Sequence, residues 1–185
     1  CDDYGALLIF DEVICGFGRT GRWFGAQHFG VTPDLMTFAK GVTSGYLPLS
    51  GVIVSRNVCD TLEEPDFVLR TGYTYSGHPT SCAAGIANLE LMERESLVDR
   101  ANHVGEQIQN GLKSLQSDNL IESWRGTGAV YAVEIEQDPM QIRNEIRSKG
   151  VILRPLNTGL AICPPLTISD KEIGQVIDTM AEVLK

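Results

Sequence analysis

The sequence predicts an α/β protein built from two units. Three observations indicate this class: three short apolar runs lie within the first 55 residues, a long amphipathic stretch follows from residue 98 to 115, and strand-like and helical segments alternate after it. We expect residues 1–95 to form part of a parallel-type sheet with its helices. Residues 96–117 are expected to form a connecting helix, and residues 118–185 a small C-terminal α+β domain.

The composition is that of a globular protein, and it disfavours several classes of partner. Hydrophobic residues make up 43% of the 185 residues, and the net charge of −9 disfavours nucleic acid, whose phosphates attract basic surfaces. No apolar run is long enough to cross a bilayer, and three scattered histidines offer no metal-binding spacing. Five cysteines without a C-x-x-C pair indicate a reducing compartment, so we expect a cytoplasmic protein.

The start of the sequence has no methionine and enters a predicted strand almost at once. Natural domains rarely begin in this way. We therefore expect a piece of a longer protein whose N-terminal part is absent from this sequence.

Three strands are predicted in the first unit. The apolar run Leu7–Phe10 is continuous rather than alternating, which is typical of a strand buried on both faces of a parallel sheet. Residues Asp34–Lys40 follow a Thr-Pro turn signal and form the second predicted strand. The β-branched run Ser50–Ser55 forms the third.

Two helices are predicted after these strands. The first begins near Pro79, a residue suited to the first helical turn. Ala83, Ile86, Ala87 and Leu91 would share one face of this helix, and the small residues on that face predict close packing. The second is amphipathic, because apolar residues recur at every third or fourth position. These residues are Val98, Ala101, Val104, Ile108, Leu112 and Leu115.

The C-terminal unit combines short strands with two helices. A strand is predicted within residues 128–136, and Asp138 with Pro139 begins a helix that ends near Gly150. The segments VILRP and LAIC, residues 151–155 and 160–163, are predicted to be short strands. Ser169 and Glu172 form a capping box that begins the last helix.

A glycine cluster after the first strand fits the pattern G-x-G-x-x-G over residues Gly16–Gly21. A dinucleotide site with this pattern needs the third glycine to open a helix and an acidic residue roughly 20 positions further on. Here Gly25, Gly30 and Pro33 interrupt any long helix, and the acidic pair precedes the glycines. We therefore reject a dinucleotide site and interpret the glycines as a tight turn, which Arg19 would brace.

The acidic pair that precedes the glycines suggests a different chemistry. Asp11 stands at the carboxyl end of a predicted parallel strand, where α/β proteins bind ligands, and a buried carboxylate there is stabilised by a protonated ring nitrogen. Lys40 ends the neighbouring strand after an apolar run, so we expect its amine to be desolvated and nucleophilic. An aspartate for a ring nitrogen and a nucleophilic lysine are what pyridoxal phosphate requires. Glu12 points elsewhere and is interpreted as structural.

Four segments together resemble the class-III aminotransferases, which are pyridoxal-phosphate enzymes of fold type I. The segments are DEVICGFGRTG, TFAKGVTSGYLPLSG, TYSGHPTSCAA and the pair ILRP and PPL, and they occur in the family's order over nearly the whole chain. The resemblance implies that residues 1–95 are the C-terminal part of the large cofactor-binding domain. It also implies that the family's phosphate-binding glycine/serine turn lies upstream of this sequence.

The resemblance implies a role for each motif residue. Asp11 would pair with the pyridine nitrogen, Val13 would press on the ring face, and Lys40 would form the Schiff base and move the substrate proton. Thr74 would bind the phosphate in the site of a partner subunit, which implies a homodimer, and Arg154 would bind a substrate carboxylate. Simpler interpretations stay open: Val13 could pack in the core, Thr74 could serve as a turn hydroxyl, and Arg154 could be a surface cation.

The branch of the family is indicated by Ile14, which stands where ornithine and acetylornithine enzymes carry glutamine. The sequence looks more like the branch that transfers an amino group from β-alanine, other ω-amino acids or primary amines to a 2-keto acid such as pyruvate. The segment after Arg154 departs from the family's usual pattern, so the substrate stays open. Two alternatives also stay open: a related aminomutase or decarboxylase, and a truncated chain that is catalytically inert.

Overall fold

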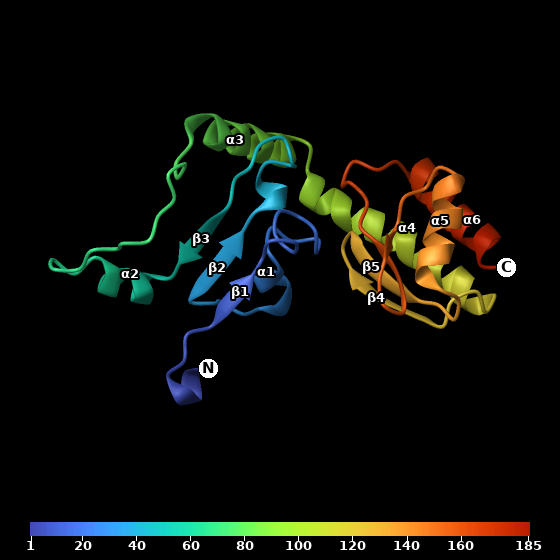
Figure 1. Ribbon diagram of the computed structural model, residues 1–185, viewed down its shortest axis with the longest axis horizontal. Coiled ribbons are helices and arrows are strands. Elements are labelled where there is room, and N and C mark those ends of the chain that lie inside the picture. The colour runs from blue at the N-terminus through green and yellow to red at the C-terminus, as the bar shows by residue number, and fades with distance from the viewer. The chain divides into compact units, whose positions relative to one another are not determined.

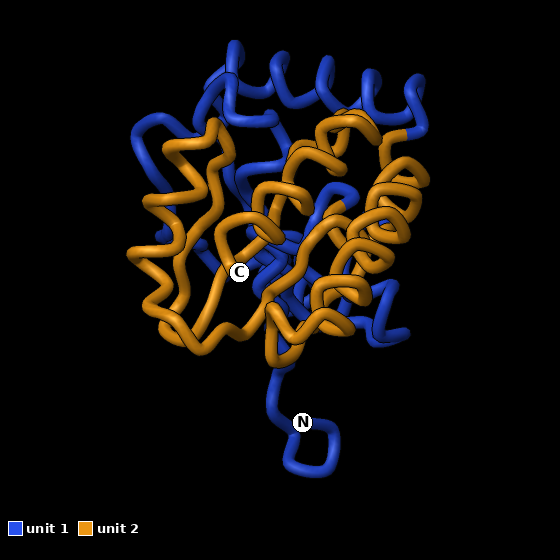
Figure 2. Tube along the Cα trace, turned by 90° about the vertical axis from the view of Figure 1, so that its right-hand side faces the viewer, with its two compact units in different colours: residues 1–18, 22–96 blue, residues 19–21, 97–185 orange.

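All 185 residues are described by the computed structural model, which divides into two units (Figures 1 and 2). Unit 1 comprises residues 1–18 and 22–96, and unit 2 comprises residues 19–21 and 97–185. The division therefore places the long predicted connecting helix in unit 2. It also places three residues of the glycine cluster, Arg19–Gly21, with unit 2.

Unit 1 contains a three-stranded sheet of order β1-β2-β3. β1 and β2 are parallel, whereas β3 is antiparallel to β2, so the sheet is mixed. The connection from β2 to β3 contains only the three-residue turn η2 and no crossover helix of the kind that parallel strands usually need. The elements are η1 (Asp2–Tyr4), β1 (Ile9–Asp11), α1 (Gly25–Phe29), β2 (Leu35–Phe38), η2 (Lys40–Val42), β3 (Gly51–Val54), α2 (Arg56–Leu62) and α3 (Pro79–Arg94).

The strands of unit 1 are not buried, which corrects the expectation for residues 7–10. Leu7 is 53% exposed and Ile9 is 60% exposed, and every residue of β1, β2 and β3 is exposed or half-buried. The apolar sequence is that of a sheet covered on both faces, but this chain leaves these positions uncovered.

The packed face of α3 also differs from the predicted one. Ile86 is 59% exposed, whereas Ser81, Gly85 and Met92 are buried. A methyl group at position 85 would lie 3.0 Å from the Leu49 side chain. Gly85 therefore allows α3 to approach the chain that follows β2.

Unit 2 contains an antiparallel sheet of order β4-β5-β7-β6 and three helices. β5 alternates buried and half-buried residues, so one face of the sheet is directed to the core. β4 was not predicted from the sequence, because its residues SWRGT show no apolar alternation. The elements are α4 (Leu97–Ser117), β4 (Ser123–Thr127), β5 (Val130–Glu134), α5 (Pro139–Ser148), β6 (Arg154–Pro155), β7 (Gly159–Ile162) and α6 (Asp170–Val183).

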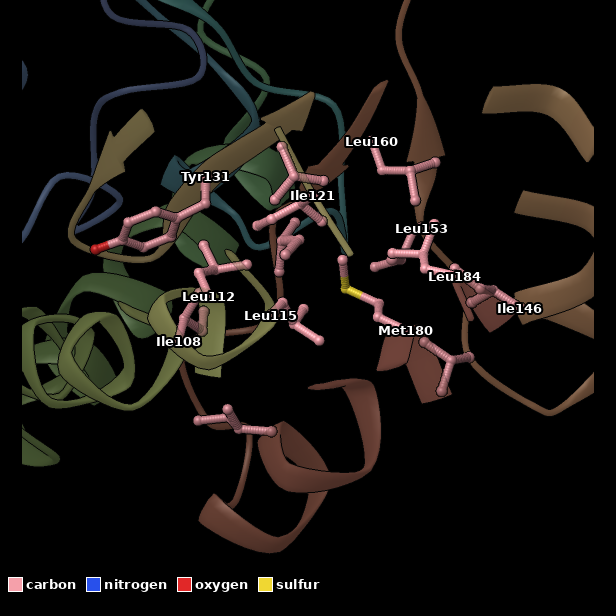
Figure 3. Close-up of a cluster of buried hydrophobic side chains, with 14 of the residues drawn as sticks. Ile108, Leu112, Leu115, Ile121, Tyr131, Ile146, Leu153, Leu160, Met180 and Leu184 are labelled. Carbon is pink, nitrogen blue, oxygen red and sulfur yellow. The ribbon is translucent and has the colours of Figure 1, made fainter. Parts of the chain in front are cut away.

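The large hydrophobic cluster of the chain lies in unit 2 (Figure 3). The apolar stripe predicted for α4 packs into it, with Ile108, Leu112 and Leu115 facing side chains from the sheet and from α6, including Met180. Burying a side chain of this size stabilises a fold by about 1.5–3 kcal/mol. The amphipathic helix is therefore held by the core of unit 2. No helix of the chain is both long and apolar enough to cross a membrane.

Candidate active site

Asp11 is the last residue of β1, and its side chain is exposed. Its Oδ1 atom accepts a hydrogen bond from the backbone N–H of Val13 at 3.0 Å and one from the Thr37 hydroxyl at 3.4 Å. Thr37 is also the residue that pairs with Asp11 across the parallel strands. Both hydrogen bonds use Oδ1, so Oδ2 remains available to a ligand.

Glu12 is the buried member of the acidic pair, with 2% of its surface exposed. Its carboxylate accepts the backbone N–H groups of Gly25 at 2.9 Å and Ala26 at 2.6 Å, at the start of α1. A methyl group at position 25 would lie 3.2–3.3 Å from both carboxylate oxygens, so glycine permits this approach. Glu12 thus ties the end of β1 to α1, which is the structural role that the sequence predicts. The expectation of burial was wrong for Asp11.

Val13 lies beyond β1, in a turn, and is half-buried. The strand ends at Asp11, so the alternation of side chains along a strand does not relate Val13 to Asp11. Instead, the N–H of Val13 bonds the Asp11 carboxylate. The packing of Val13 on a cofactor ring stays a prediction.

Lys40 begins the turn η2, two residues after β2 ends. Because Asp11 pairs with Thr37, Asp11 and Lys40 stand at the carboxyl ends of adjacent parallel strands, as the sequence predicts. Lys40 has a left-handed backbone with φ of 46°. Its side chain is exposed rather than desolvated in this structure, because the strand end is not covered.

A cavity of about 720 Å³ lies beside Lys40. Its other lining residues include Tyr73, Tyr75, His78 and Ser81. Thr74 is exposed within the turn that Tyr73 and Ser76 close, and it does not line this cavity, although its two neighbours do. The phosphate-binding role of Thr74 stays a prediction.

Arg154 is an exposed residue of β6, paired with Ala161 of β7. It belongs to unit 2, whereas Asp11, Val13, Lys40 and Thr74 belong to unit 1. Burial raises the pKa of the neighbouring Cys163 thiol, and the positive charges of Arg19 and Arg154 oppose this effect. The substrate-binding role of Arg154 also stays a prediction.

The glycine cluster forms a turn, and Arg19 connects residues 19–21 to the rest of unit 2. The guanidinium of Arg19 donates hydrogen bonds to the carbonyls of Ala129 at 2.9 Å and Pro164 at 2.6 Å. The helix α1 has five residues and begins at Gly25 rather than at Gly21. The third glycine therefore does not open a helix, which a dinucleotide site with this pattern needs.

Burial raises the pKa of the Cys15 thiol, and the nearby carboxylates of Glu12 and Asp11 raise it further. A thiolate is disfavoured in this position, so Cys15 is not an activated nucleophile. All five cysteines of the chain are free.

Asn88 is a residue of this region that the sequence did not single out. Its side-chain amide contacts the turn that follows Lys40. The signal is visible in hindsight, because Ser81, Gly85, Asn88 and Met92 recur at helical spacing on one face of α3. The apolar residues of α3 drew attention to a different face.

The comparison with known families decides the classification. The family described as Aminotransferase class-III matches residues 1–184 of this chain. The chain belongs to the class-III aminotransferases. The members of this family are pyridoxal-phosphate enzymes, and the resemblance noted in the four motifs is confirmed.

Individual class-III aminotransferases are similar to this chain throughout. The diaminobutyrate–2-oxoglutarate transaminase of Halomonas elongata is 40% identical, with 94% of this chain and 41% of that protein covered. The β-alanine–pyruvate aminotransferase of Pseudomonas aeruginosa is 36% identical, with coverage of 100% and 44%. The crystal structure of an (S)-enantioselective omega-transaminase from Thermomicrobium roseum has a TM-score of 0.94 and 40% identity, with coverage of 99% and 44%. The fold is therefore that of the corresponding part of a fold type I enzyme.

The chain spans less than half the length of these class-III aminotransferases. Its own residues nevertheless fit pyridoxal phosphate. Asp11 has one carboxylate oxygen available for a ring nitrogen, and Lys40 presents an exposed amine beside a cavity of about 720 Å³. These are the two side chains that would hold the reactive part of the cofactor.

Proposed function

We propose that this chain carries the lysine and aspartate of a transaminase site that uses pyridoxal phosphate. The reaction would move an amino group from an ω-amino acid or primary amine to a 2-keto acid such as pyruvate. The observation that carries the proposal is the placement of Asp11 and Lys40 at the ends of paired parallel strands in a class-III aminotransferase chain.

Each side chain then has a definite task. Pyridoxal phosphate supplies an electron sink for the charge that remains when a proton leaves the substrate carbon. The Asp11 carboxylate keeps the ring nitrogen protonated, with Val13 against the ring. The Lys40 amine would hold the cofactor, and it would take the proton from the substrate carbon and return it. Arg154 binds the carboxylate of the acceptor through charge-assisted hydrogen bonds.

A homodimer is part of the same proposal, with Thr74 binding the phosphate in the site of the partner subunit. Residues 63–80 are exposed throughout, and the segment between α2 and α3 runs clear of the sheet of unit 1 (Figure 1). It carries exposed Phe67, Val68, Leu69, Tyr73 and Tyr75. An exposed apolar segment of this kind supports contact with another subunit.

The names of two similar proteins support the choice of substrates, namely a β-alanine–pyruvate aminotransferase and an omega-transaminase. A third is named for 2-oxoglutarate as acceptor. The proposal therefore commits to a 2-keto acid as the acceptor class, with pyruvate as the first compound to test.

Chemical capture of the cofactor tests this proposal directly. The chain is mixed with pyridoxal phosphate, reduced with borohydride and mapped by peptide mass spectrometry. We expect a pyridoxyl adduct on Lys40 that is strongly reduced in Asp11→Ala and unchanged in Asp118→Ala, an exposed control.

The outcomes separate the alternatives. The second chain to test is extended upstream to the full length of the family's members. An adduct on that longer chain alone would show that these 185 residues are an inert part of a competent enzyme. Amine and keto-acid screening of that longer chain would then distinguish a transaminase from an aminomutase or decarboxylase. Absence of a Lys40 adduct from both chains would overturn the proposal.

A further inference from the structure

The backbone of Lys40 adopts a conformation that needs support from its surroundings. Its φ of 46° lies in the left-handed region, which residues with a long side chain rarely occupy. The turn that it begins contains three backbone hydrogen bonds, from Val42 N–H to the Ala39 carbonyl at 3.3 Å, from Thr43 N–H to the Lys40 carbonyl at 3.2 Å and from Ser44 N–H to the Gly41 carbonyl at 3.3 Å. These bonds lie at the long end of the usual range for N–H···O hydrogen bonds, so a further contact would hold the turn more firmly.

A side chain of α3 provides this further contact. The amide nitrogen of Asn88 donates to the carbonyl of Gly41 at 2.9 Å and to that of Val42 at 3.2 Å. These are the two residues that directly follow Lys40. Asn88 is half-buried, and Gly85, one turn earlier on the same face, lies beside the Leu49 side chain, which would be 3.0 Å from a methyl group at position 85.

Packing against Phe17 also confines the turn. A methyl group at position 41 would lie 2.8 Å from the Cβ atom of Phe17, which belongs to the glycine turn after Asp11. Gly41 is therefore pressed against Phe17 while Asn88 bonds its carbonyl. The main chain after Lys40 is held from two elements that lie far apart in the sequence.

We propose that Asn88 is a positioning residue for Lys40. Its amide fixes the two carbonyl groups after Lys40, and this fixes the direction in which the lysine leaves the strand end. The inference rests on the proposed function, because it concerns the presentation of the Lys40 amine to the cofactor. A purely structural Asn88 would anchor α3 without affecting the chemistry of Lys40.

Substitution of Asn88 tests the proposal in two ways. Asn88→Leu removes the donor, and Asn88→Asp places a carboxylate against two carbonyl oxygens, whereas Asn88→Gln retains an amide donor. Asn110→Asp, at an exposed position of α4, is the matched charge control.

The measurements are hydrogen exchange of the Val42, Thr43 and Ser44 amides in the cofactor-free protein, and the rate of borohydride-trapped capture of pyridoxal phosphate by Lys40. Capture is measured in the 185-residue chain if that chain captures the cofactor, and otherwise in the longer chain.

We expect the leucine and aspartate variants to exchange these amides about tenfold faster, which corresponds to the loss of one or two ordinary hydrogen bonds. Capture by Lys40 should slow by a similar factor, while the amides of unit 2 keep their exchange rates. Asn88→Gln should recover most of both properties, and Asn110→Asp should change neither.

Two results would overturn the inference. Unchanged exchange and unchanged capture in Asn88→Leu and Asn88→Asp would show that Asn88 does not hold the turn. Faster exchange with unchanged capture would show that Asn88 is structural only. Failure of the unsubstituted chain and the longer chain to capture the cofactor is a different result, because it refutes the proposed function.

Discussion

At the scale of single residues, Asp11 and Glu12 show how two adjacent carboxylates acquire opposite tasks. Asp11 ends the strand with its carboxylate exposed, whereas Glu12 is buried and bonded to two backbone N–H groups. A buried carboxylate is tolerated only when such donors satisfy it. Glu12 therefore holds the end of β1 in place, and Asp11 remains available for chemistry.

Replacement of Glu12 tests this division of tasks. Glu12→Gln removes the charge from two charge-assisted hydrogen bonds and turns an NH₂ group toward one backbone donor. We expect the free energy of unfolding to fall by about 1.5–3 kcal/mol, measured by urea denaturation. Glu64→Gln, at an exposed position of unit 1, is the control. Equal stability of the two variants would contradict the role of Glu12.

At the scale of elements, the start of α6 combines a capping box with a small charge cluster. The Ser169 hydroxyl accepts the Glu172 N–H, and the Glu172 carboxylate accepts the Ser169 N–H at 2.8 Å. Asp170 contacts His103 and Arg100 of α4, each at 3.0 Å. Hydrogen bonds from His103 and then Arg100 lower the pKa of Asp170, and hydrogen bonds from Ser169 lower the pKa of Glu172.

The pH dependence follows from the direction of these shifts. A carboxylate with a lowered folded-state pKa contributes stability above its ordinary pKa, and that contribution is lost as the pH falls through the lowered value. We expect thermal stability to decline below about pH 4, near the ordinary carboxyl pKa. Ser169→Ala should cost about 1 kcal/mol at pH 7 and should weaken the acid decline.

The checks are thermal unfolding curves at pH 7, 5 and 3, with Ser117→Ala at the exposed end of α4 as the control. An acid decline that is the same with and without Ser169 would contradict the contribution of the capping box.

At the scale of the whole molecule, the two units differ in how well they are buried. The members of the large hydrophobic cluster belong to unit 2, while all the large exposed hydrophobic residues except Met140 and Ile152 belong to unit 1. Regions with few buried apolar contacts open most readily. Unit 2 is therefore expected to be the stable part of this chain.

Limited digestion with trypsin tests the difference. Arg70 is the only lysine or arginine between residues 57 and 93, and it lies in the exposed stretch of residues 63–80. We expect the first cleavage after Arg70, followed by a persistent fragment that contains residues 97–185, identified by mass spectrometry. An early cleavage within α4 or between residues 123 and 162 would contradict the expected stability of unit 2.

The main helices, the capping box at Ser169, and the positions of Asp11 and Lys40 at the ends of neighbouring strands were all predictable from the sequence. These features depend on residues close in sequence or on motif spacing, so a linear pattern records them. The roles of Val13, Thr74 and Arg154 stay predictions.

Three features depend on packing in three dimensions: which carboxylate is buried, the antiparallel direction of β3, and the hydrogen bond from Asn88 to the turn after Lys40. Periodicity shows which face of an element is apolar, but it does not show which element covers that face or which polar group faces another chain segment. Asn88 and Gly41 are 47 residues apart, and no local pattern relates them. The contact forms because α3 packs beside the turn, which is a property of packing in three dimensions.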